Sequence, residues 1–152
     1  MVDGYALGSA ALFFSWAVFV IFFDLAYRRV PNELVIIGAA SGIVAGALQV
    51  GWQGHLVTSL IGGASAVILL LPGYMFRRCG AGDVKAAAVI GLWGGVGVVL
   101  GAVAAAGVLS LLWYAVAPRR AAPDGVRVQS AVRLPYGAFL AIGAAATMAA
   151  GL

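Results

Sequence analysis

Residues 80–117 read GAGDVKAAAVIGLWGGVGVVLGAVAAAGVLSLLWYAVA, a glycine-rich segment with one acid and one lysine that leads into an uncharged run over 86–117. A membrane-spanning helix needs about 20 mostly apolar residues. The run is long enough to cross a bilayer but too long for one comfortable helix. The break at Trp93-Gly94-Gly95 predicts a short helix over roughly 84–93 and a longer helix over roughly 96–117.

The composition predicts an integral membrane protein. Of the 152 residues, 64% are hydrophobic and 9% are charged, whereas soluble domains average about 25% charged residues. The mean hydropathy is +1.08. We therefore expect one transmembrane domain over residues 1–152 with the lipid bilayer as its surroundings. The basic residues form short clusters between apolar runs, which argues against nucleic acid as a partner.

Three further uncharged runs cover residues 4–23, 34–76 and 134–152. The second run is twice the length of one span. Its middle, residues 49–55, has the composition of a turn with an interfacial tryptophan, so this run holds two spans. The sequence predicts an all-α bundle of about six transmembrane helices.

Basic residues predict the orientation of the bundle. All nine lie in or beside the loops after spans one, three and five, and the opposite loops hold none. The positive-inside rule places these loops in the cytoplasm and both termini on the external side. Asp24 and Asp83 then lie at the cytoplasmic membrane edge. The basic residues are Arg28, Arg29, Arg77, Arg78, Lys85, Arg119, Arg120, Arg127 and Arg133.

Two acids at one membrane edge suggest catalysis, because acids are costly in lipid and tend to be functional there. Two carboxylates in contact can share one proton, so that one activates water and the other donates to a scissile carbonyl. Other interpretations stay open. Asp24 can pair with Arg28, Asp83 can cap a helix, and both can relay protons in a small transporter or assembly subunit.

The residues around Asp83 suggest a place for substrate. Gly80 and Gly82 permit close approach of two backbones, so an extended peptide can lie beside them, and a side chain at position 82 would obstruct it. Lys85 can reach lipid headgroups or orient an acid of the substrate. A catalytic pair of Cys79 and His55 is excluded, because the two residues are expected on opposite sides of the membrane.

Three segments resemble the motifs of one family. Residues 24–32, DLAYRRVPN, resemble the first-aspartate motif of type IV prepilin peptidases, and residues 80–85, GAGDVK, match their Gly-x-Gly-Asp-x-Lys motif. Residues 134–140, LPYGAFL, resemble their last-helix signature. The resemblance implies an intramembrane aspartyl protease of six helices that cleaves the basic leader from prepilins, usually after a glycine, with Asp24 and Asp83 as the catalytic pair.

The resemblance also carries finer expectations. The chain looks like the minimal form found with tight-adherence (Flp-type) pilus systems, without the cysteine-rich segment and methyltransferase activity of larger members. We expect a location in the bacterial inner membrane, prepilins as partners, and no cofactor or metal. Pro135 and Tyr136 are expected to shape the start of the last helix near the substrate, although packing explains them equally well.

Overall fold

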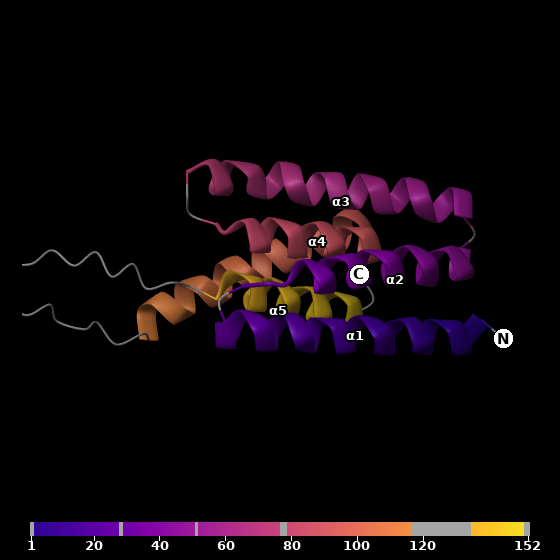
Figure 1. Ribbon diagram of the computed structural model, residues 1–152, viewed down its shortest axis with the longest axis horizontal. Helices are drawn as coiled ribbons and strands as arrows, with labels where there is room; N and C mark the ends of the chain where they lie inside the picture. Colours follow the sequence, from indigo (N-terminus) through magenta and orange to yellow (C-terminus); the bar gives the residue numbers. More distant parts are fainter. Residues whose placement is uncertain (1, 28, 51, 77–78, 117–134, 151–152) are drawn as a thin grey trace, which may run out of the picture.

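The computed structural model describes residues 2–27, 29–50, 52–76, 79–116 and 135–150, and within these ranges it contains five helices and no strand. The helices lie along one common direction (Figure 1). The prediction of an all-α protein is confirmed. The helices are α1 (Val2–Tyr27), α2 (Asn32–Val50), α3 (Trp52–Met75), α4 (Ala81–Val116) and α5 (Tyr136–Ala149).

Helix α4 is two helices joined across a sharp break. At Gly95 the backbone has φ 68° and ψ −165°, a conformation that glycine adopts readily and residues with a side chain adopt rarely. After this break the chain runs back along the bundle, so both ends of α4 lie at the same end of the molecule (Figure 1). The predicted break at Trp93-Gly94-Gly95 is confirmed.

Three described segments are long and apolar enough to cross a membrane: Leu7–Tyr27, Gly54–Met75 and Ala81–Val116. Asn32–Leu48 and Tyr136–Ala149 are shorter apolar helices. These lengths and compositions are those of a membrane protein. Six crossings, and the side on which the termini lie, stay predictions.

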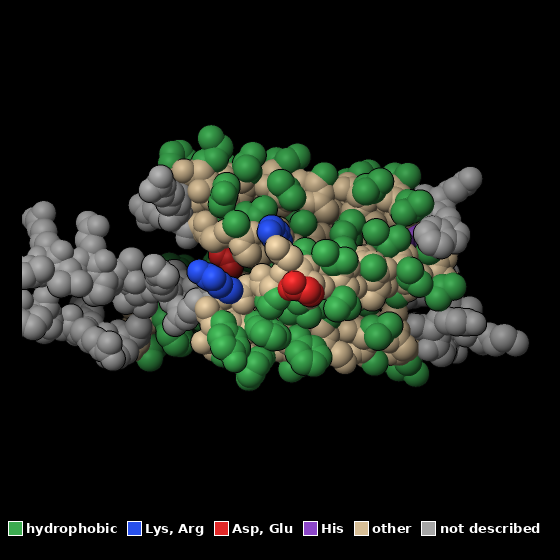
Figure 2. Space-filling model, in the orientation of Figure 1, with side chains coloured by type: hydrophobic (Ala, Val, Ile, Leu, Met, Phe, Trp, Pro, Cys, Tyr) green, Lys and Arg blue, Asp and Glu red, His purple; other side chains and the backbone are tan. Residues whose placement is uncertain are grey.

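Side chains are distributed as lipid surroundings require. Large hydrophobic groups cover the outer surface (Figure 2), while many buried positions hold alanine and glycine. Gly62 and Gly91 illustrate the interior, because a Cβ atom on either would collide with the backbone of the other. Small residues let helices approach closely, and such packing holds helices together in lipid.

The end of α1 and the starts of α2, α4 and α5 lie at one end of the bundle (Figure 1). The described charged side chains gather toward this end, whereas the single histidine lies at the other end (Figure 2). We call the first the acid end. Its described charged residues are Asp24, Arg29, Glu33, Asp83 and Lys85.

Candidate active site

Asp24 lies in the last turn of α1 and is 7% exposed. Its Oδ2 accepts a hydrogen bond of 2.8 Å from the backbone N–H of Ala138, near the start of α5. The first N–H groups of a helix lack partners within the helix and favour a negative charge nearby. The start of α5 therefore supplies a partner for a carboxylate that is buried at the acid end.

Asp83 is half-buried in the first turn of α4. Its Oδ2 accepts a hydrogen bond of 2.8 Å from the backbone N–H of Gly80, and its own N–H donates to the Gly80 carbonyl at 3.1 Å. Helix α4 begins at Ala81, so Gly80 is the residue at its N-cap position. Asp83 is the third residue of the helix and not, as the capping interpretation expected, its N-cap. The reciprocal bonds resemble a capping box, and they fix the carboxylate at the helix start.

The two carboxylates meet at Gly137. A Cβ atom on this glycine would lie 3.1 Å from Asp83 Oδ1 and 3.2 Å from Asp24 Oδ2, tighter than nine in ten real Cβ contacts. The two acids are also close enough for their charges to interact. Residues that are 59 positions apart in the chain thus form one acid pair, and the bare backbone of Gly137 lies between them.

The segment at the start of α5 accounts for this meeting. Pro135 is fully buried and its carbonyl accepts a hydrogen bond of 3.1 Å from the N–H of Phe139. Tyr136 is half-buried and packs against the hydrophobic core. The sequence interpretation selected these two residues and missed Gly137 and Ala138, which contact the acids. The available signal was the glycine that follows Pro-Tyr in the first turn of the helix.

Lys85 joins α4 to the start of α2. Its Nζ donates a hydrogen bond of 2.8 Å to Oδ1 of Asn32. The sequence interpretation considered lipid headgroups and a substrate acid for this lysine and did not consider Asn32. The signal was available, because Asn32 ends the first-aspartate motif and Lys85 ends the second motif. This bond connects the two motif segments directly.

The two glycines before Asp83 differ in their surroundings. Gly80 is exposed and its N–H holds the Asp83 carboxylate. Gly82 is half-buried, and a Cβ atom there would make ordinary contacts of 3.6–3.7 Å with Val30. A small side chain at position 82 would therefore face the connection between α1 and α2.

Cys79 and His55 do not form a catalytic pair. His55 is buried and its Nε2 lies 2.9 Å from Oγ of Ser59, at the end of the bundle opposite the acids (Figure 2). Cys79 lies in the connection before α4. Burial raises the pKa of its thiol, and the nearby Asp83 carboxylate raises it further. A thiol that stays protonated is a poor nucleophile.

Comparison with known proteins identifies the family. Residues 11–115 match the type IV leader peptidase family. The chain belongs to this family. Membership makes it a peptidase of the leader-peptidase kind, and the matched region includes both aspartates. Neither the curated proteins nor the solved structures include a match. The start of α5 lies beyond the matched region, so its link to the site rests on the contacts of Gly137 and Ala138.

Proposed function

We propose that this peptidase is an intramembrane aspartic endopeptidase that removes the basic leader from type IV prepilins of the Flp type at the cytoplasmic edge of the bacterial inner membrane. The observation that carries the proposal is the placement of the Asp24 and Asp83 carboxylates against the same glycine, Gly137. Family membership supports the leader-peptidase part of the proposal. The acid pair supplies the chemistry.

In this mechanism the two carboxylates share one proton. The ionised one takes a proton from a water molecule as the water oxygen attacks the scissile carbonyl carbon. The protonated one donates its proton to the carbonyl oxygen. Collapse of the tetrahedral intermediate breaks the C–N bond. The leaving nitrogen takes the proton that the base removed from water, and the other carboxylate regains a proton from a hydroxyl of the intermediate, so that the pair again shares one proton. Each proton transfer of this kind, from the acid or to the base, raises the reaction rate by about 10²–10⁴-fold. Both acids are already oriented by backbone N–H groups.

The position of the pair supports a substrate that is half in water and half in lipid. The acids lie at the ends of apolar helices, where the described charged side chains gather. A basic leader stays in water and an apolar segment stays in lipid, because charged groups are costly in the bilayer. The scissile bond between these two parts then lies at the depth of Asp24 and Asp83.

Co-expression with a prepilin tests the proposal. Asp24→Asn and Asp83→Asn should each lower leader removal by at least about 100-fold, because an amide keeps the shape but provides neither acid nor base. The readout is the mobility shift of the prepilin on a gel, with membrane insertion of each variant measured in parallel. Glu33→Gln is the matched control, since Glu33 is an exposed acid at the same end. Inserted Asn variants that retain most activity would exclude the aspartic mechanism.

A further inference from the structure

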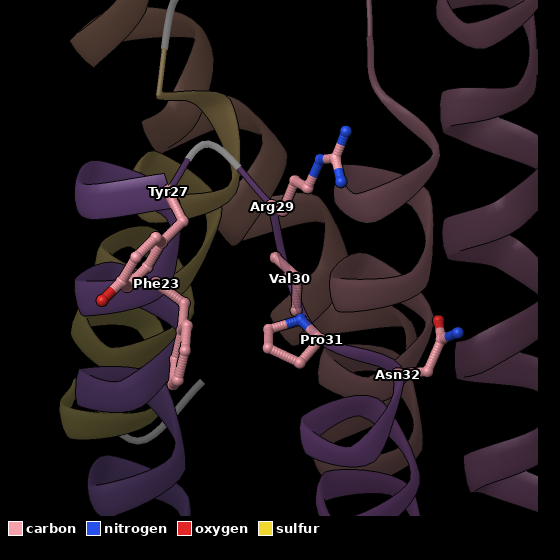
Figure 3. Close-up of a pocket in the computed structure, with 6 residues that line it drawn as sticks. All are labelled: Phe23, Tyr27, Arg29, Val30, Pro31 and Asn32. Atoms are coloured by element: carbon pink, nitrogen blue, oxygen red, sulfur yellow. The ribbon is translucent and has the colours of Figure 1, made fainter.

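Two pockets of similar volume lie at opposite ends of the bundle. One, of about 350 Å³, lies between the end of α1 and the connection to α2, and its described lining comes from residues 23–32 (Figure 3). The other, of about 330 Å³, is lined in part by His55, which lies at the end away from the acids (Figure 2). We call this second one the far pocket. It takes no part in the proposed cleavage, and its walls indicate a ligand.

All five helices build the far pocket. Phe13 comes from α1, Gly46 from α2, His55 from α3, Trp93 from α4 and Met148 from α5. Sites for small molecules are usually preformed hollows of about 300–1,000 Å³. Because every helix contributes a wall, the packing of the whole bundle fixes the shape of the far pocket. The pocket at the acid end, by contrast, is bounded by one short stretch of chain.

Aromatic rings form an apolar wall of the far pocket. The rings of Phe13 and Trp93 meet edge to face, with their centroids 5.4 Å apart. The indole N–H of Trp93 donates to the Gly38 carbonyl at 2.8 Å, so this donor is already used and the ring is held in place. Aromatic rings prefer edge-to-face and offset contacts with one another. The wall therefore suits a ligand that brings a further ring.

His55 gives the same pocket a hydrogen-bond acceptor. Its Nε2 lies 3.2 Å from the Gly42 carbonyl and 2.9 Å from Ser59 Oγ. A carbonyl only accepts, so Nε2 carries the proton, and in a neutral imidazole the other nitrogen, Nδ1, is then an acceptor. No residue that the structure describes donates to Nδ1. The side chain is 9% exposed, and a buried acceptor without a donor is costly. A ligand with one donor would remove this cost.

We propose that the far pocket binds a small apolar molecule with an aromatic ring and one hydroxyl group, the chemistry of a phenol. The ring packs against Phe13 and Trp93, and the hydroxyl donates to Nδ1 of His55. Such a molecule dissolves in lipid and can enter from the bilayer. Trp93 and Gly94 of the lining directly precede the break in α4 at Gly95, so a bound ligand should stabilise the folded bundle. The inference does not depend on the proposed function.

The experiment compares two probes that differ at one group. Para-propylphenol carries the hydroxyl, and para-propyltoluene has a methyl group in its place. Each probe is titrated into the purified full-length protein in detergent while the thermal midpoint is measured, because a ligand that binds the folded state raises this midpoint. The phenol should bind about fivefold more tightly than the toluene, since one neutral hydrogen bond supports a difference of that size.

Variants that fill the far pocket test where the probes bind. Ala10→Phe and Ala45→Leu each enlarge a lining residue, from α1 and α2, and should reduce the response of the midpoint to both probes. Ala11→Phe is the matched control, because Ala11 is exposed, follows Ala10 in α1 and lies outside the described lining. This control should respond to both probes as the wild type does.

Variants of His55 test the hydrogen bond. His55→Leu removes the acceptor and should abolish the preference for the phenol over the toluene. His55→Gln keeps a donor and an acceptor and should retain part of the preference. The preference is a ratio of two affinities measured on the same variant, so a lower stability of either variant does not imitate the effect.

Three results would overturn the inference. Equal affinity of the wild-type protein for the two probes would make the far pocket a purely apolar site, such as one for an acyl chain. A saturable response that persists in both filling variants would place the probes elsewhere. The absence of a saturable response in the wild-type protein would leave the pocket to water. None of these measurements uses cleavage, so each result leaves the proposed function standing.

Discussion

The two ends of the bundle both hold buried polar groups, but the partners of these groups are opposite in kind. At the acid end, the carboxylates of Asp24 and Asp83 accept hydrogen bonds from backbone N–H groups. At the other end, the buried Ser59 hydroxyl donates to the backbone carbonyl of Leu92 at 2.7 Å. A carboxylate has about four acceptor positions and can still bind water, whereas a hydroxyl has a single hydrogen to give. In the proposed mechanism the first end carries the chemistry, and we expect the second end to contribute to stability.

His55 and Ser59 form a hydrogen-bond network with backbone carbonyls at the second end. Its Nε2 lies 2.9 Å from Ser59 Oγ and 3.2 Å from the Gly42 carbonyl. The Ser59 hydroxyl gives its hydrogen to the Leu92 carbonyl, and a carbonyl can only accept, so Nε2 carries the proton that both contacts share. Leu92 lies just before the break at Gly95, where carbonyls lose their helical partners. The network therefore stabilises the turn in α4.

The comparison predicts the largest effect at Gly137. Gly137→Ala adds a Cβ atom between the carboxylates of Asp24 and Asp83, so one or both acids must move. The carboxylates would have to give way by a few tenths of an ångström. Because a displacement of about 1 Å can cost about 100-fold in rate, we expect leader removal to fall by about tenfold. Gly97→Ala is the matched control, because a Cβ atom on Gly97 meets nothing within 4 Å.

The gel assay of the co-expressed prepilin measures both glycine variants, and the thermal midpoint in detergent reports whether each is folded. A folded Gly137→Ala enzyme with wild-type activity would show that the acids do not work from the positions seen here. The acid end would then be a packed helix junction like the other end.

A smaller effect is expected from the bond between Lys85 and Asn32. Lys85→Met keeps the stem and removes the ammonium, and Asn32→Leu removes the acceptor. Each should lower kcat about fivefold, because a hydrogen bond contributes roughly 1 kcal/mol and this one positions the start of α4 beside the connection to α2. The double variant should be no worse than either single variant, since both remove one interaction.

Asn32→Asp is the rescuing variant, because a carboxylate also accepts from the ammonium and should keep kcat near the wild-type value. Losses that add in the double variant would mean that Lys85 and Asn32 act separately. Lys85 would then be free to contact the substrate, as the sequence interpretation allowed.

The sequence predicted what depends on composition along the chain. Long uncharged runs indicated helices. The run over 86–117 is too long for one comfortable span, and Trp93-Gly94-Gly95 within it indicated the position of the break in α4. The one-sided basic residues suggested that Asp24 and Asp83 share a membrane edge. These inferences need no knowledge of which helices are neighbours.

The missed residues are contacts between helix ends. Gly137 and Ala138 are more than 50 residues from Asp83, and the partner of Lys85 is 53 residues away. Spacing rules relate residues within one helix and do not say which backbone N–H approaches a carboxylate from another helix. These contacts follow from the packing of the bundle, which one sequence alone does not reveal.

At the other end, a change should affect stability and leave activity intact. Ser59→Ala leaves the Leu92 carbonyl without its donor, and an unsatisfied buried group costs about 1–3 kcal/mol in the free energy of unfolding. The thermal midpoint in detergent should fall, while leader removal well below that midpoint stays at the wild-type rate. Ser15→Ala is the control, because exposed Ser15 bonds only to its own helix among the contacts described. A loss of cleavage without a loss of stability would assign a catalytic role to this end.

The smallest effect is expected at Gly82, and it decides between two views of the acid end. The sequence interpretation places substrate against the bare backbone here, so that any side chain obstructs it. In the structure a Cβ atom on Gly82 faces Val30 at 3.6–3.7 Å, and substitutions that fit without strain change energies by about 0.5 kcal/mol or less. The Gly82→Ala enzyme should therefore cleave the prepilin within about twofold of the wild-type rate, since 0.5 kcal/mol corresponds to little more than that.

The measurement is the initial rate of leader removal in detergent, with Gly97→Ala as the reference for a harmless added methyl group. A tenfold loss in a normally folded Gly82→Ala enzyme would show that the substrate backbone lies directly on this glycine.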